Sequence, residues 1–129
     1  MNRKKILIVD DDRQVSLALS IRLKAADYDV DVAGDGESGL QKLAARAPDV
    51  VLLDMRMPGI DGLEVMRQMK RDPRLADIPV IFVSANAQEN AKRAALNAGG
   101  KLFLEKPFES RALLDAIRGV LEQNSRVTA

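Results

Sequence analysis

The sequence of 129 residues contains no cysteine and no histidine. The absence of cysteine excludes a disulfide framework, and the absence of both residue types excludes a zinc site built on them and a thiol or imidazole nucleophile. Any bound metal must therefore be held by oxygen ligands, which favours Mg²⁺, Mn²⁺ or Ca²⁺.

An excess of charge of one sign is also lacking, because 20 basic residues face 19 acidic ones and leave a net charge of +1. This near-balance gives no electrostatic case for direct binding to nucleic acid or to an anionic membrane surface. Long apolar runs are missing too, since none approaches the roughly 20 residues that span a bilayer. The N-terminal run stops at Val9, far short of a signal-peptide core of about 7 to 15 residues. We therefore expect a cytoplasmic protein.

Short apolar segments alternate with segments of helical periodicity along the whole chain. The pattern predicts strands at 5–9, 28–33, 50–54, 78–85 and 101–105, and helices at 13–26, 35–47, 61–72, 88–98 and 109–122. Repeated βα units with short connections predict a doubly wound α/β fold, (βα)5, in which helices cover both faces of a five-stranded parallel sheet. We expect one domain over 1–122, a polar C-terminal tail over 123–129 and no output domain after it.

The apolar faces of these helices differ in bulk. Over 13–26 the expected inward positions are Val15, Ala18, Leu19, Leu23 and Ala26. Over 88–98 the apolar stripe consists of alanines, which bury little area. We therefore expect the helix at 88–98 to dock weakly and to move more easily than the others.

Chemically reactive residues follow the predicted strands. Asp10 and Asp11 follow the first strand, Asp54 ends the third, Ser84 lies at the end of the fourth and Lys106 follows the fifth. Because the carboxyl ends of parallel strands share one edge of a sheet, we expect these side chains to converge there. Clustered carboxylates repel one another unless a cation neutralises them, and Mg²⁺ is suited to that role. With a lysine and a hydroxyl beside Asp54, the set is typical of phosphoryl transfer to a carboxylate nucleophile.

These motifs resemble those of bacterial two-component response-regulator receiver domains, and the resemblance extends from Lys5 to Leu121. ILIVDDD is similar to the acidic turn of that family, and LLDMRMPGIDG is similar to its phosphoacceptor motif. The resemblance implies a stand-alone, CheY-like domain with the flavodoxin-like strand order 2-1-3-4-5, which flavodoxin and CheY share.

The resemblance also implies a role for each matching residue. Asp54 is the expected phosphoacceptor. Asp10 and Asp11 are the expected metal pair, with Asp11 as the direct ligand, and they form the metal site together with Asp54 and the backbone carbonyl of Arg56. The expected ion is Mg²⁺, with Mn²⁺ as an alternative, and no organic cofactor is expected.

On the other side of Asp54, Ser84 matches the family hydroxyl and Lys106 matches the family lysine. Ser84 and Phe103 are the expected switch residues, and the Lys106–Pro107 peptide bond is expected to be cis. Arg56 and Asn86 occupy positions at which the family varies its rate of dephosphorylation. The segment 99–101 departs from the usual pattern of the family, and Phe103 lacks the hydroxyl of a tyrosine.

By this resemblance the chain receives a phosphoryl group from a histidine kinase or a phosphotransfer protein. It then changes the surface formed by the fourth helix, fifth strand and fifth helix to control a downstream protein. The only reactions expected of it are its own phosphorylation and autodephosphorylation. We expect no direct contact with nucleic acid or membrane, and a monomer or weak dimer.

Three alternatives compete with this interpretation. A phosphatase or phosphotransferase acting on free metabolites would usually place a second aspartate two residues beyond the nucleophile, where this chain has Arg56. A flavodoxin-like cofactor binder would need Ser, Thr or Gly after the first strand, where this chain has acids. A pseudo-receiver that signals by protein contact alone would lack the acceptor or the lysine, and this chain has both.

Overall fold

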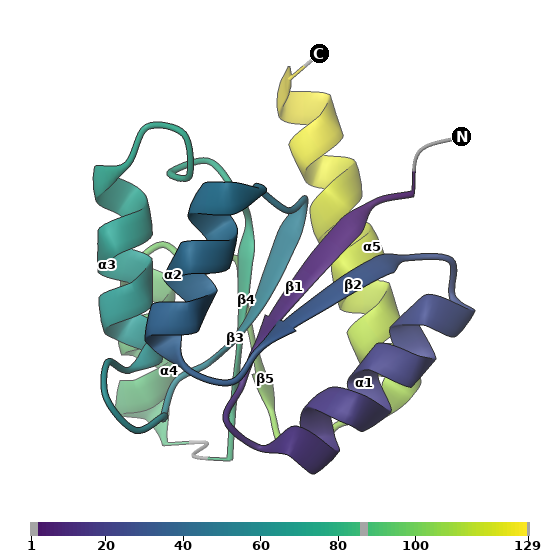
Figure 1. The fold of residues 1–129 in the computed structure, drawn as a ribbon, viewed down its shortest axis with the longest axis horizontal. Coiled ribbons are helices and arrows are strands. Elements are labelled where there is room, and N and C mark those ends of the chain that lie inside the picture. The colour runs from purple at the N-terminus through teal and green to yellow at the C-terminus, as the bar shows by residue number, and fades with distance from the viewer. Residues whose placement is uncertain (1–2, 86–87, 129) are drawn as a thin grey trace.

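The computed structural model describes residues 3–85 and 88–128, in which strands and helices alternate along the chain. The strands are β1 (Lys5–Val9), β2 (Asp29–Ala33), β3 (Val50–Asp54), β4 (Val80–Ser84) and β5 (Leu102–Glu105). The helices are α1 (Arg13–Ala25), α2 (Gly36–Ala45), α3 (Gly62–Arg71), α4 (Glu89–Asn97) and α5 (Ser110–Thr128). All the strands are parallel and lie in the order β2-β1-β3-β4-β5, which confirms the predicted fold (Figure 1).

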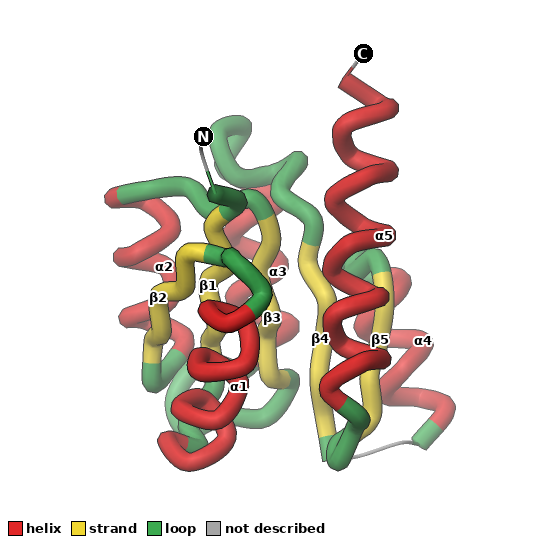
Figure 2. The backbone as a smooth tube through the Cα atoms, turned by 90° about the vertical axis from the view of Figure 1, so that its right-hand side faces the viewer, coloured by secondary structure: helices red, strands yellow, loops and turns green. Residues whose placement is uncertain are grey.

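The sheet is buried on both faces, with α1 and α5 on one side and α2, α3 and α4 on the other (Figures 1 and 2). Successive residues of β1 enter different cores: Leu7 and Val9 pack with α2, α3 and α4, whereas Ile6 and Ile8 pack with α1 and α5. This two-sided burial explains why β1, β3 and β4 are unbroken apolar runs.

Most bounds differ from the predicted ones by one or two residues, but the C-terminal helix differs more. We expected a polar tail over 123–129, yet α5 continues to Thr128 (Figure 1). The segment from Gln123 to Thr128 contains neither proline nor glycine, so nothing in it interrupts the backbone hydrogen bonds of the helix. None of the described helices is long and apolar enough to cross a membrane.

The buried face of α1 also differs from the prediction. Ala18 and Ala26 are exposed, and Ser16 and Ser20 are buried in their place. Positions 16, 20 and 23 recur at the 3.6-residue period, so Ser16 and Ser20 share a helix face with Leu23 and that face lies against the sheet.

Candidate functional site

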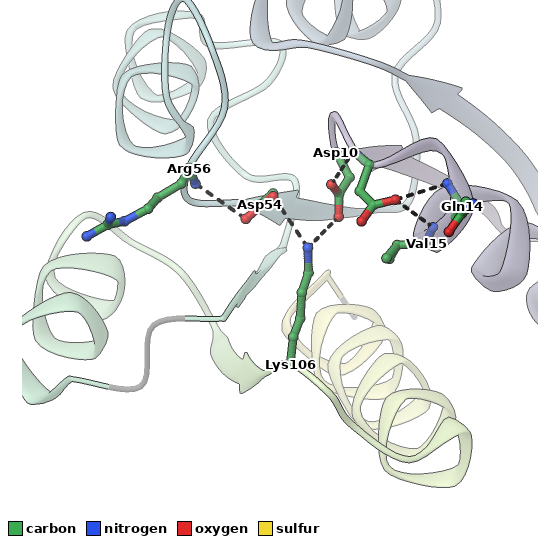
Figure 3. A network of polar contacts seen from close by, with 7 residues as sticks. Asp10, Gln14, Val15, Asp54, Arg56 and Lys106 are labelled. Carbon is green, nitrogen blue, oxygen red and sulfur yellow. Dashed lines mark hydrogen bonds and ion pairs between the residues drawn. The ribbon is translucent and has the colours of Figure 1, made fainter.

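Two buried aspartates and one lysine meet at the carboxyl edge of the sheet. Asp10 follows β1 and is 2% exposed, and Asp54 ends β3 and is 6% exposed. The Lys106 ammonium nitrogen lies 2.7 Å from Asp10 Oδ2 and 3.4 Å from Asp54 Oδ2 (Figure 3). Segments 96 and 52 residues apart in the sequence are thereby joined at one point.

Each aspartate uses its second oxygen to accept a backbone hydrogen bond from the loop that follows it. Asp10 Oδ1 accepts from the Asp12 N–H at 2.9 Å, and Asp54 Oδ1 accepts from the Arg56 N–H at 3.3 Å. Both carboxylates are therefore oriented by their own loops and by Lys106 at the same time (Figure 3). Such an arrangement is organised before any ligand arrives.

Burial raises the pKa of Asp54, and the nearby charge of Asp10 raises it further, while Lys106 and the Arg56 N–H act in the opposite direction. Burial alone would lower the pKa of Lys106, but its hydrogen bond and ion pair with Asp10, together with the charge of Asp54, raise it, so the ammonium form is favoured. One ammonium group cannot balance several carboxylates. The site therefore favours a further cation.

Asp10, Asp11 and Asp54 can each offer a carboxylate oxygen to a single metal ion, since these ligand atoms all lie within 4.8 Å of one another. The donors are hard oxygen atoms, which suit Mg²⁺. The third acid of the turn has a different role, because Asp12 accepts hydrogen bonds from the backbone of Gln14 and Val15 and caps α1.

The other predicted residues lie at or near the same edge. Ser84 ends β4 and is buried, and its carbonyl accepts a 2.8 Å hydrogen bond from the Lys106 N–H. The Lys106–Pro107 peptide bond is cis, as the resemblance implies. Phe103 is half-buried against the core formed with α2, α3 and α4, and it is paired with Phe82 in the sheet register. Asn86 lies outside the described residues.

Sequence reasoning missed Gly62 as part of the site. A β-carbon at Gly62 would clash with the Asp54 carbonyl oxygen and lie 2.9 Å from the Met55 α-carbon. The Gly62 N–H also donates to the Met55 carbonyl at 3.0 Å, which closes the loop after β3. The Asp61-Gly62 pair could have indicated this close contact, but in the sequence it predicts only the start of a helix.

A groove of about 530 Å³ borders the site between α1 and the segment that joins β5 to α5. It has a mainly apolar lining that includes Val15, Ala18, Leu19, Arg22, Lys106, Pro107 and Phe108. The outer face of α1 beside it carries the exposed side chains of Leu17 and Ile21, which are 63% and 61% exposed.

The fold and the site define a class of doubly wound α/β domains with an aspartate at the end of the third strand, flanked by acids and a lysine. The chain belongs to the response regulator receiver domain family, whose model matches residues 6–118.

Individual relatives agree with this assignment. The chain is 37% identical over 123 residues to the DNA-binding dual master transcriptional regulator RpaA of Synechocystis, covering 95% of this chain and 51% of RpaA. It is 39% identical over 121 residues to the response regulator MprA of a Mycobacterium species, covering 94% of this chain and 52% of MprA. The chain thus spans about half the length of these curated relatives.

Solved structures have the same fold over almost their whole length. A putative response regulator from Chloroflexus aurantiacus superposes with a TM-score of 0.90 at 33% identity, covering 94% of this chain and 99% of that one. A CheY-like receiver domain protein from Methanospirillum hungatei superposes with a TM-score of 0.91 at 27% identity, covering 97% of this chain and 98% of that one.

Proposed function

We propose that this chain is a signalling switch that accepts a phosphoryl group on Asp54. A carboxylate oxygen of Asp54 bonds to phosphorus as the phosphorus–nitrogen bond of a donor phosphohistidine breaks, and the imidazole leaves. The observation that carries the proposal is the position of Asp54, which is nearly buried between the Lys106 ammonium group and the Arg56 N–H, beside acids that can hold a divalent cation.

The surrounding groups together neutralise the negative charge of the phosphoryl group. In this proposal Asp10, Asp11, Asp54 and the carbonyl of Arg56 hold Mg²⁺, or Mn²⁺ in its place. The ion supplies positive charge for the phosphoryl oxygens when it is bound. Lys106 balances a further oxygen and stays protonated, because its ion pairs with the aspartates favour the ammonium form.

The output proposed for the switch is the surface formed by α4, β5 and α5. Ser84 and Phe103 are the proposed switch residues, and their positions at the end of β4 and within β5 link Asp54 to that surface. Two apolar side chains are exposed there, Leu96 of α4 and Leu102 of β5, at 48% and 38%. A downstream protein, rather than nucleic acid or membrane, is the proposed partner of a monomer or weak dimer.

The groove beside α1 is the proposed approach for the phosphoryl donor. It is continuous with Lys106, and the exposed Leu17 and Ile21 extend its apolar surface along α1. A helix of a histidine kinase or phosphotransfer protein fits such a surface, because two amphipathic helices can bury these side chains against each other.

The remaining parts of the proposal concern extent and location. The functional unit is residues 1–122, in the cytoplasm, where an ATP-dependent kinase can supply the phosphoryl group. The chain is not proposed to act on other substrates, and its chemistry is confined to gaining and losing its own phosphoryl group.

Acetyl phosphate with Mg²⁺, followed by intact-mass measurement, tests the proposal. The wild-type protein should gain one phosphoryl group, and Asp54→Asn should gain none. Asp12→Asn is the matched control, because Asp12 belongs to the same acidic turn but caps α1, a role that asparagine also fills. Labelling that survives in Asp54→Asn, or that is lost equally in Asp12→Asn, would refute the assignment of Asp54.

A further inference from the structure

One edge of the sheet is formed by β2, which among the described strands is bonded to β1 alone. Asp29 donates to the Lys4 carbonyl at 3.0 Å, and the Ala33 carbonyl accepts from Asp10 at 3.1 Å. In a parallel pair, alternate residues of a strand bond to the same neighbour, so Asp29, Asp31 and Ala33 face β1. The peptide groups of Val30 and Val32 therefore point away from the sheet. An edge of this kind is a template for pairing with another strand.

The outward N–H of Val32 already has a partner from its own strand. It donates to Asp31 Oδ1 at 2.9 Å, and the same oxygen accepts from the Lys42 ammonium group at 2.8 Å. Lys42 belongs to α2, which packs beside β2 (Figure 1). The edge thus carries a fixed carboxylate–ammonium pair in the position that an incoming strand would need.

We propose that the Asp31–Lys42 pair protects the β2 edge from pairing with the same edge of a second copy of this chain. An incoming strand must displace the carboxylate from the Val32 N–H and remove water from two charged groups. Both groups are well solvated, with side chains 38% and 41% exposed, so their burial carries a desolvation cost. In a symmetric dimer each copy would bring its own Asp31 and Lys42, so the cost is incurred twice.

The Asp31 carboxylate stays charged at neutral pH. Its hydrogen bond with Lys42 lowers its pKa, the Val32 N–H lowers it further, and the small degree of burial opposes them. The protection is independent of the phosphorylation proposed at Asp54, because Asp31 does not belong to the group around Lys106.

Asp31→Ala tests the proposal, with Asp29→Ala as the matched control on the same strand. Asp29→Ala removes the same charge from the same strand face. Light scattering after size-exclusion chromatography should show the mass of Asp31→Ala rising with concentration, while Asp29→Ala follows the wild type. Acetyl phosphate should label both variants as it labels the wild type.

Amide hydrogen exchange identifies the surface that associates. In dilute Asp31→Ala the Val32 amide should exchange roughly tenfold faster than in the wild type, because a hydrogen bond to a charged group is lost. At high concentration the Val30 and Val32 amides should both become protected. Asp31→Thr also removes the carboxylate but places a good strand former in β2, so it should self-associate in the same way, with Asp29→Thr as its control, and it decides the question if Asp31→Ala does not fold cooperatively.

Three results would overturn the proposal. The first is an Asp31→Ala protein that folds and keeps the wild-type mass at every concentration. The second is an equal rise in mass for Asp29→Ala, which would show that charge alone matters. The third is an association that leaves the Val30 and Val32 amides unprotected.

Discussion

Helices α3 and α4 cover the same face of the sheet, yet they are anchored to it very differently. α3 buries Val65, Met66 and Met69, none of them more than 1% exposed. The buried residue of α4 is Ala95, whose side chain is a single methyl group. Because hydrophobic stabilisation scales with the apolar area removed from water, α3 has several times more of it than α4.

The N-terminal ends of the two helices also differ, and again α3 is the more firmly held. Asp61 caps α3 by accepting a 2.9 Å hydrogen bond from Glu64, and Gly62 lies directly against the backbone of β3. α4 begins after Gln88, a residue type that is not among the preferred N-caps. The helix that follows Asp54 is thus fixed, and the helix that follows Ser84 is lightly held. A switch needs such a difference, because a modest change in free energy at the site can then move one element and leave the other in place.

Truncation of a buried side chain should reveal the largest difference between the two helices. Met66→Ala in α3 leaves a cavity, and we expect it to lower the free energy of unfolding by roughly 2–5 kcal/mol. Ala95→Gly in α4 removes one methyl group and adds backbone freedom, with an expected loss of about 1 kcal/mol. Urea unfolding measures both. Equal losses would mean that Ala95 anchors α4 as strongly as Met66 anchors α3.

Glycine contacts provide a second comparison. A β-carbon at Gly62 would clash with the backbone of Asp54, which cannot move without disturbing β3. A β-carbon at Gly100 would lie 2.6 Å from the buried Phe82 ring and 3.0 Å from the Ala95 carbonyl, so its shortest contact is with a side chain rather than with backbone.

We therefore expect Gly62→Ala to cost about 3 kcal/mol, at the upper end of the range for overpacking, and Gly100→Ala about 2 kcal/mol, because a side chain can yield more readily than the backbone of β3. Gly62→Ala should also slow labelling by acetyl phosphate, since it distorts the loop that orients Asp54. Gly100→Ala should leave labelling intact and change the amide chemical shifts of α4. Normal labelling in Gly62→Ala would contradict the role given to that glycine.

Much of the fold could be predicted because parallel strands buried on both faces leave a simple signal. Ile6 and Leu7 enter opposite cores, so β1 has to be apolar throughout, and the same holds for β3 and β4. The meeting of Asp54 with Lys106 followed from the shared carboxyl edge of those strands. The prediction from apolar residues alone failed at Ser16 and Ser20, because the helix face that lies against the sheet is set by the position of Leu23 and includes these two polar residues.

The finer geometry of the site could not be predicted from the sequence. Spacing predicts that Asp10 and Asp54 share an edge, but not that Lys106 lies closer to Asp10, at 2.7 Å, than to Asp54, at 3.4 Å. That preference depends on strand offsets and side-chain rotamers. The contact of Gly62 with the preceding strand likewise depends on how the loop after β3 folds back, which no local pattern encodes.

The effect of metal binding on amide exchange is a third way to compare α3 with α4, and we expect an effect of intermediate size. At a roughly tenfold excess of Mg²⁺ over its dissociation constant, the native state should gain about 1.4 kcal/mol. For amides of α3 that exchange only through global unfolding, the exchange rate should fall by the factor that corresponds to this gain in stability, roughly tenfold. Amides of α4 should exchange through local opening and stay nearly unchanged, because that opening does not release the metal. Equal slowing in both helices would show that α4 opens only with the whole domain.

Substitutions at the helix caps should have the smallest effects. One removes the cap of α3, and the other gives α4 a cap of the same kind. Asp61→Ala removes the cap of α3 and should cost about 1 kcal/mol in global stability. Gln88→Asp gives α4 a preferred cap residue near its positive end and should slow local exchange in α4 by a factor that corresponds to roughly 0.5 kcal/mol. We expect α4 to open locally, so Gln88→Asp should hardly change the urea midpoint, whereas Asp61→Ala should lower it. A shift of that midpoint by Gln88→Asp as large as the one caused by Asp61→Ala would mean that both helices belong to one cooperative unit.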